Sequence, residues 1–122
     1  VIGCGAISKE HLSFIAESSR AELVGVTDLS RAAREYAAQR YGAAAVYDSA
    51  ETMLAEAQVD VVHVLTPPRT HKDLSIAALR SGANVVCEKP IAATLEELDA
   101  MYAVAAERSM PRLAARPNAL MP

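Results

Sequence analysis

Two glycines near the start of the chain form the first pattern with a chemical meaning. The segment VIGCGAISKEH places Gly3 and Gly5 between an apolar pair and a stretch of helical character. A glycine turn between a strand and a helix suits a phosphate group, because the backbone can approach the ligand and the helix offers unpaired N–H groups. Ser8 occupies the place of a third glycine, which mainly controls how closely helix and strand pack. Two glycines alone also fit a purely structural turn.

An acidic residue downstream favours a dinucleotide site. Asp28 closes the apolar run ELVGVTD at the position where a carboxylate that binds ribose hydroxyls is expected. An alternative role for Asp28 is to cap the helix that begins near Arg31. The acid favours NAD, because it repels the 2′-phosphate of NADP. Arg31 could hold such a phosphate, so NADP stays open as a second cofactor.

Strands and helices alternate in the predicted structure. Apolar periodicity predicts helices over residues 7–18, 31–41, 49–57, 70–81 and 94–108, and strands over residues 1–2, 22–27, 44–47, 60–65, 84–87 and 112–116. Short apolar strands separated by helices are typical of a parallel sheet that helices cover on both faces. The expected fold is therefore an α/β Rossmann-type doubly wound sheet in three layers, with strand order 3-2-1-4-5-6.

Local signals fix several of the expected helix ends. Thr94 with Glu97 predicts a capping box, and Asp48 with Glu51 predicts a similar helix start with the aspartate as cap. Two glycines stand where helices should end, Gly42 and Gly82. An apolar stripe at helical spacing predicts a core face, formed by Leu95, Leu98, Met101, Tyr102 and Ala105.

Composition excludes several classes of protein. The 122 residues carry a formal charge of −3 and 52% apolar residues, which indicates one domain with a packed core and no surface for nucleic acid. No apolar run approaches the length of a membrane span. Cys4 and Cys87 lie in apolar stretches, so we expect small buried residues, no disulfide and no metal site. A reducing cytoplasm is the expected compartment.

The segment TPPRTHKDLSIAALRSGANVVCEKPIAATLEEL, together with GCGAISKEH, resembles the N-terminal domain of the Gfo/Idh/MocA family of NAD(P)-dependent oxidoreductases. The resemblance extends over essentially the whole chain, and TPP…H and EKP are its specific parts. It implies hydride transfer between a nicotinamide cofactor and a hydroxyl or carbonyl carbon of a sugar-, inositol- or diol-like substrate. It also implies a C-terminal substrate and dimerisation domain beyond residues 1–122, a homo-oligomeric intact enzyme, and a fragment that is inactive alone.

The resemblance also implies roles for single residues. Lys89 would be the catalytic group, and the Lys89–Pro90 peptide bond would be cis. The cofactor would be held by Gly3, Gly5, Ala6, Ile7, Asp28, Thr66, Pro67, His71, Glu88, Lys89 and Arg116. Arg31 joins this set through its own charge.

Alternatives remain for the most important of these residues. An ammonium group at the end of a strand can stabilise the alkoxide that develops as a hydride leaves, whereas Lys89 could instead be a surface residue paired with Glu88. His71 could act as a helix cap, and His63 and His11 are expected to be packing residues. A non-catalytic NAD(P)-binding module would need no Lys89. A methyltransferase also uses a glycine turn and an acid, but it explains neither EKP nor the TPP loop.

Overall fold

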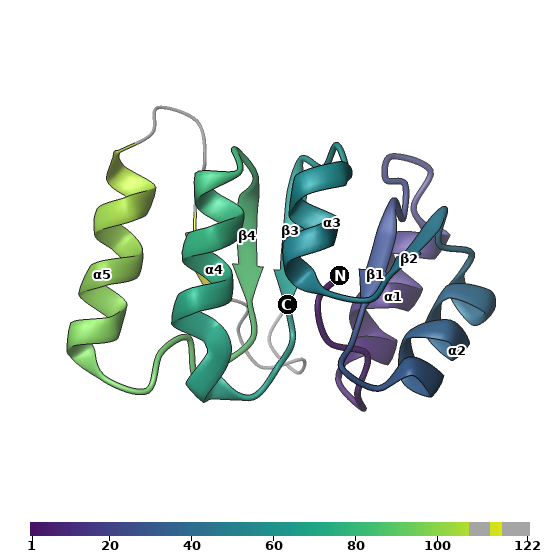
Figure 1. Ribbon diagram of the computed structural model, residues 1–122, viewed down its shortest axis with the longest axis horizontal. Coiled ribbons are helices and arrows are strands. Elements are labelled where there is room, and N and C mark those ends of the chain that lie inside the picture. Colours follow the sequence, from purple (N-terminus) through teal and green to yellow (C-terminus); the bar gives the residue numbers. More distant parts are fainter. Residues whose placement is uncertain (108–112, 116–122) are drawn as a thin grey trace. The chain divides into compact units, whose positions relative to one another are not determined.

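Two parallel sheets and the helices packed on them form the computed structural model of this chain, which describes residues 1–107 and 113–115 (Figure 1). The first sheet belongs to the unit Val1–Gln58 and the second to the unit Val59–Pro122. None of the described helices is long and apolar enough to span a membrane.

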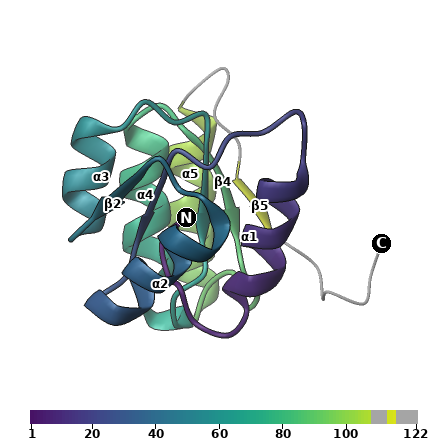
Figure 2. The ribbon, with the colours of Figure 1, turned by 90° about the vertical axis from the view of Figure 1, so that its right-hand side faces the viewer.

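The first unit contains α1 (Ser8–Glu17), β1 (Gly25–Thr27), α2 (Arg31–Tyr41), β2 (Ala45–Tyr47) and α3 (Ala50–Glu56). Strands β1 and β2 pair in parallel, with Val26 opposite Val46. Helices α2 and α3 both contact this sheet, and α1 packs against α2 (Figure 2). The core consists of apolar side chains that these elements bury, including Leu12, Val26, Ala37 and Met53.

Residues 1–3 extend the first sheet along the free edge of β1. The main-chain nitrogen of Val1 donates to the Gly25 carbonyl at 2.9 Å, and the Thr27 N–H donates to the Val1 carbonyl at 3.0 Å. The Gly3 N–H donates in turn to the Thr27 carbonyl at 2.9 Å. The spatial order is therefore β2, β1 and residues 1–3, which are the neighbours that the predicted order requires in this half.

The second unit contains β3 (Val61–Val64), the 3₁₀ helix η1 (Pro68–Thr70), α4 (His71–Arg80), β4 (Asn84–Cys87), α5 (Leu95–Ala106) and β5 (Leu113–Ala115). Its strands are parallel in the order β3, β4, β5. Helix α4 packs on β3 and β4, and α5 lies beside α4 (Figure 1). The core of this unit includes Val62, Val64, Leu79, Val85 and Met101.

Capping chemistry explains where α5 and α2 begin or end. The Thr94 hydroxyl accepts the Glu97 N–H at 3.1 Å, while the Glu97 carboxylate accepts the Ala93 N–H at 3.0 Å. This confirms the predicted start of α5. Gly42 and Gly82 have φ angles of 74° and 99°, in the left-handed region that favours glycine, which confirms both predicted helix ends.

Two sequence predictions need correction. The cap of α3 is Ser49, whose hydroxyl accepts the Thr52 N–H at 3.0 Å, so the prediction of Asp48 as cap is wrong by one residue. The expected core face of α5 is also too wide, because Leu95 is 78% exposed and Tyr102 is 48% exposed. Only the side of α5 that carries Met101 and Val104 is buried, since α5 packs along one face on α4 and β5.

Candidate functional site

The glycine turn between residues 1–3 and α1 is held by Ser8. Gly3 has a φ angle of 98°, which lets the chain leave the sheet sharply. Ser8 is the first residue of α1 and is only 3% exposed. Its hydroxyl and its N–H both donate to the Gly5 carbonyl, at 2.5 and 3.1 Å. The serine at the third glycine position thus fixes the turn, a role that the small size of its side chain did not indicate.

Three main-chain N–H groups at this turn are available to a ligand. Within residues 1–107 and 113–115, no group accepts a hydrogen bond from the N–H of Gly5, Ala6 or Ile7. Gly5 and Ala6 are exposed, and a Cβ at Gly5 would meet no atom within 4 Å. Unpaired N–H groups before a ten-residue helix form a favourable place for a phosphate. The turn therefore fits the pyrophosphate of a dinucleotide.

Asp28 lies beside this turn and is fixed by two main-chain donors. One carboxylate oxygen accepts the Cys4 N–H at 2.7 Å, and the other accepts the Ser30 N–H at 2.7 Å. The cap of α2 is Ser30, whose hydroxyl accepts the Ala33 N–H at 3.2 Å. The alternative of Asp28 as the α2 cap is therefore wrong. Each carboxylate oxygen keeps acceptor capacity for a ribose hydroxyl.

The arginines after Asp28 have different partners. Arg31 pairs with Glu35 at 2.8 Å on the exposed side of α2, and this pair raises the pKa of Arg31 and lowers the pKa of Glu35. Arg34 instead donates to the Asp28 carbonyl at 3.0 Å. The guanidinium that contacts Asp28 thus belongs to Arg34, which the sequence analysis did not identify. Arg34 lies one helical turn after the cap residue Ser30, and this spacing could have indicated a contact with the loop before α2.

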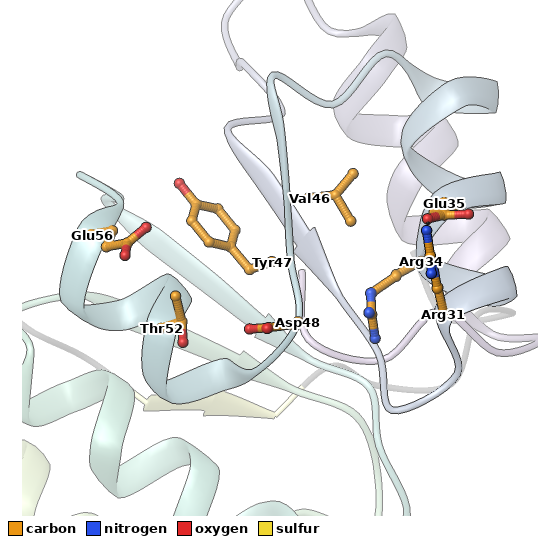
Figure 3. A pocket seen from close by; sticks show the side chains of 8 residues that line it. All are labelled: Arg31, Arg34, Glu35, Val46, Tyr47, Asp48, Thr52 and Glu56. Carbon is orange, nitrogen blue, oxygen red and sulfur yellow. Dashed lines mark hydrogen bonds and ion pairs between the residues drawn. The ribbon is translucent and has the colours of Figure 1, made fainter.

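A pocket of about 460 Å³ lies along β2 in the same unit (Figure 3). Val46 and Tyr47 point to opposite sides of the strand, toward α2 and α3 respectively. Its lining mixes both charge signs and consists of Arg31, Arg34, Glu35, Val46, Tyr47, Asp48, Thr52 and Glu56. Of the predicted site residues within the described part of the chain, this pocket includes Arg31 and leaves out the glycine turn and Asp28. It is not the predicted cofactor site.

In the second unit, His71 joins the two loops that follow β3 and β4. The ring is 1% exposed, with Nδ1 2.8 Å from the Pro90 carbonyl oxygen and Nε2 2.6 Å from the Thr66 carbonyl oxygen. The Thr70 hydroxyl lies 2.6 Å from the Thr66 hydroxyl and 2.7 Å from the Pro67 carbonyl. His71 therefore links the loop at Thr66 to Pro90 of the EKP segment. The N-cap of α4 is Thr70, whereas His71 is the first residue of α4 and the C-cap of η1, where its N–H donates to the Pro68 carbonyl.

The EKP segment directly follows β4. The Glu88 N–H donates to the Val64 carbonyl at 3.0 Å, which continues the β3–β4 ladder, and Glu88 is half-buried. Lys89 is exposed, and no carboxylate of the described residues forms an ion pair with it. The ion pair between Lys89 and Glu88 that the sequence allowed is therefore absent from the structure. The Lys89–Pro90 bond is cis, which confirms that expectation.

The remaining histidines and cysteines have structural surroundings. His11 is 1% exposed on α1, and His63 is half-buried on β3. Both thiols are free, Cys87 buried and Cys4 half-buried, so the expected burial holds fully only for Cys87. Burial raises the pKa of each thiol to about 11, with the Asp28 carboxylate adding to the effect at Cys4. No cluster of metal ligands occurs among the described residues, and Arg116 lies outside them.

Comparison with known proteins places this geometry in a family. Residues 1–113 match the model of an oxidoreductase family with an NAD-binding Rossmann fold. The chain is 38% identical over 98 residues to D-glucoside 3-dehydrogenase of Escherichia coli (strain K12), a match that covers 80% of this chain and 28% of that protein. It is 34% identical over 107 residues to inositol 2-dehydrogenase of Rhizobium meliloti (strain 1021), covering 88% and 32%.

Solved structures agree with the sequence matches. The WlbA dehydrogenase from Bordetella pertussis, in complex with NADH and UDP-GlcNAcA, superposes with a TM-score of 0.88 at 34% identity, over 94% of this chain and 33% of that one. GenD2 from gentamicin A biosynthesis, in complex with NAD, gives a TM-score of 0.87 at 29% identity, over 93% and 32%. The chain thus spans about a third of the length of the relatives that it matches.

Proposed function

Because this chain belongs to the Gfo/Idh/MocA family of oxidoreductases, and its domain is an NAD-binding Rossmann domain, we propose that it is the cofactor half of a dehydrogenase that acts on a sugar-like substrate. The observation that carries the proposal is the glycine turn. Its three available N–H groups lie beside a carboxylate that main-chain donors hold in place. That arrangement suits the pyrophosphate and ribose of NAD.

We assign cofactor-binding roles to individual residues of the chain. Gly3, Gly5, Ala6 and Ile7 would bind the pyrophosphate, and Asp28 would bind the adenosine ribose. Arg31 would lie near the ribose 2′ position, where its ion pair with Glu35 reduces its attraction for a phosphate and favours NAD over NADP. Thr66, Pro67 and Glu88 would line the nicotinamide end, and Arg116 is assigned there from the sequence alone. Bound NAD supplies the hydride acceptor, and these side chains orient it and exclude water.

Lys89 is the proposed catalytic residue of this half. Its ammonium group is exposed after β4 and forms no ion pair with the described residues, so it is available to a substrate hydroxyl. There it would donate a hydrogen bond that strengthens as negative charge develops on the substrate oxygen. Only its neutral amine form, which has a free lone pair, would accept the hydroxyl proton as a base. Relatives named for glucosides, inositol and apiose support a hydroxyl or carbonyl carbon of a sugar, inositol or diol as the site of oxidation or reduction.

The finer architecture follows from the same proposal. We infer the strand order 3-2-1-4-5-6, in which residues 1–2 count as the first strand, because each unit has the required order within itself. Residues 1–122 would be one cofactor domain, and a C-terminal domain would supply the rest of the substrate pocket and the homo-oligomer contact. The two free thiols fit a reducing cytoplasm.

Ligand titration and one substitution test the proposal. NADH is expected to bind the chain more tightly than NADPH, and S-adenosylmethionine is expected not to bind. In the full-length enzyme, Lys89→Ala should lower kcat by roughly 10²–10⁴-fold and leave NADH affinity within about threefold. The matched control is Lys72→Ala, which removes another lysine of the same unit, paired with Asp73 at 3.6 Å; this variant should keep full activity. Full turnover by Lys89→Ala, or binding of S-adenosylmethionine alone, would overturn the assignment.

A further inference from the structure

The β3–β4 ladder ends at a proline. Its successive bonds run from Asn84 N–H to the Asp60 carbonyl at 2.9 Å and, two steps later, from Glu88 N–H to the Val64 carbonyl at 3.0 Å. In a parallel ladder the next bond would run from residue 90 to the Thr66 carbonyl. Residue 90 is proline, which has no N–H to donate. The Thr66 carbonyl therefore needs another donor.

His71 stands at the position of that missing bond. Its Nε2 lies 2.6 Å from the Thr66 carbonyl oxygen that the ladder leaves open, and its Nδ1 lies 2.8 Å from the carbonyl oxygen of Pro90 itself. The ring thus contacts the two residues that the ladder would have joined. Both partners belong to the unit Val59–Pro122, and the ring is 1% exposed.

The chemistry of the partners determines what the ring must carry. Carbonyl oxygens only accept hydrogen bonds, whereas a neutral imidazole has one N–H and one bare nitrogen. A neutral ring would therefore place a lone pair against one carbonyl oxygen at a buried site. Two bonds, at 2.6 and 2.8 Å, need an N–H on each nitrogen, which is the imidazolium form.

The contacts of the His71 ring nitrogens are with the two carbonyl oxygens, and the charged side chains on neighbouring segments are exposed or have other partners. Lys72 and Asp73, next on α4, pair with each other at 3.6 Å. Arg69 on η1 and Lys89 before Pro90 are exposed, and Glu88 is half-buried. Cys87 stays a neutral thiol, since burial raises its pKa to about 11. On α5, which also contacts α4, the acids Glu96 and Asp99 are exposed and Glu97 accepts the Ala93 N–H.

We propose that His71 is a positioning residue whose doubly protonated ring replaces the missing ladder bond and fixes the Lys89–Pro90 segment to the loop at Thr66. Both ring nitrogens are used in this way, so His71 acts on cofactor and substrate through the two loops that it joins. The consequence for Lys89 rests on the proposed function, whereas the hydrogen bonds of the ring do not.

Nuclear magnetic resonance of the ring tests the bridge without any assay of activity. In the ¹⁵N-labelled protein at neutral pH, His71 should show two protonated ring nitrogens, both with slowly exchanging N–H signals. Assignment uses the His71→Gln variant, with the signals of His11 and His63 as internal references. A His71 ring with one unprotonated nitrogen at neutral pH would overturn the proposal.

Kinetics of the full-length enzyme test the positioning role. His71→Gln keeps a donor for one carbonyl only, so kcat should fall at least tenfold while NADH affinity stays within about threefold. The matched control is Ser75→Ala, one turn further along α4, because Ser75 is also fully buried and loss of its hydroxyl leaves both carbonyl contacts of His71 in place. Ser75→Ala should keep kcat within twofold, and an unchanged kcat in His71→Gln would refute the role. Two ring N–H signals in a protein that oxidises no sugar-like substrate would refute the proposed function and leave the bridge intact.

Discussion

Replacement of Asp28 by asparagine tests whether one carboxylate supports both the fold and the cofactor. The two side chains have nearly the same shape, but an asparagine offers one oxygen and one NH₂ group. Its oxygen can still accept either the Cys4 N–H or the Ser30 N–H, both of which lie 2.7 Å from the carboxylate in the native protein. The amide nitrogen would then face the other donor, so one bond is lost.

The size of the effect follows from the surroundings of Asp28. A hydrogen bond to a charged group contributes about 1.5–3 kcal/mol, and half-burial of Asp28 places the loss near the lower limit. We expect the free energy of unfolding to fall by about 1–2 kcal/mol. Loss of a charged acceptor for the ribose should weaken NADH about tenfold, which corresponds to about 1.4 kcal/mol. NADPH should lose less, because the variant no longer repels its 2′-phosphate.

Urea unfolding and fluorescence titration with NADH and NADPH measure both quantities. Asp48→Asn is the matched control, since it removes the same charge from an exposed aspartate after the neighbouring strand β2. The control should change stability by less than about 0.5 kcal/mol and NADH affinity by less than twofold. If Asp28→Asn binds NADH as tightly as the native protein, Asp28 does not bind the ribose. If its stability is also unchanged, the two main-chain bonds do not form.

Four further predictions concern the packing of side chains and the two thiols. Met53→Ala, at a side chain 1% exposed on α3, should lower the free energy of unfolding by about 2–5 kcal/mol, whereas exposed Leu29→Ala should change it little, as denaturant titration can show. Gly25→Ala would place a Cβ 2.7 Å from the Tyr47 ring, so the free energy of unfolding should fall by about 1–3 kcal/mol. In a background that already carries Tyr47→Ala, the same substitution should lower the free energy of unfolding much less. Additive effects of the two substitutions would exclude the steric cause. With thiol pKa values of about 11, alkylation at pH 8 should be on the order of a hundredfold slower than for a free cysteine. Because the folded state keeps protons that the unfolded chain loses above about pH 9, stability should also decrease as pH rises from about 9 to 11; a constant stability over this range would contradict those pKa values.

Sequence periodicity predicted the elements well where the signal was local. The helix ends at Gly42 and Gly82 and the cap at Thr94 depend on single residues and their immediate neighbours, and the structure confirms all three. Asp48 and Ser49 are both good cap residues, so their order in the sequence did not decide between them. The prediction that Leu95 and Tyr102 are buried was wrong for another reason. Burial on a helix depends on which neighbouring element covers each face, and periodicity does not show this.

In the candidate site, too, residues were predicted from local spacing, whereas their contacts with distant main-chain groups were not. Gly3, Gly5 and Asp28 were identified from spacing, and the structure places the carboxylate against the turn. The contacts of Arg34 with Asp28, Ser8 with Gly5, and His71 with two carbonyls were not predicted. Each joins a side chain to a main-chain carbonyl, and the pattern of residue types in the sequence does not reveal which carbonyls lack a partner.

The Ser8 hydroxyl bond has a consequence for how a ligand would be received. The turn is already tied at Gly3 by Thr27, at Cys4 by Asp28 and at Gly5 by Ser8, before any anion arrives. A preorganised site of this kind requires little ordering of the backbone, and so association there should lose little conformational entropy at the glycines, the residues that have most to lose.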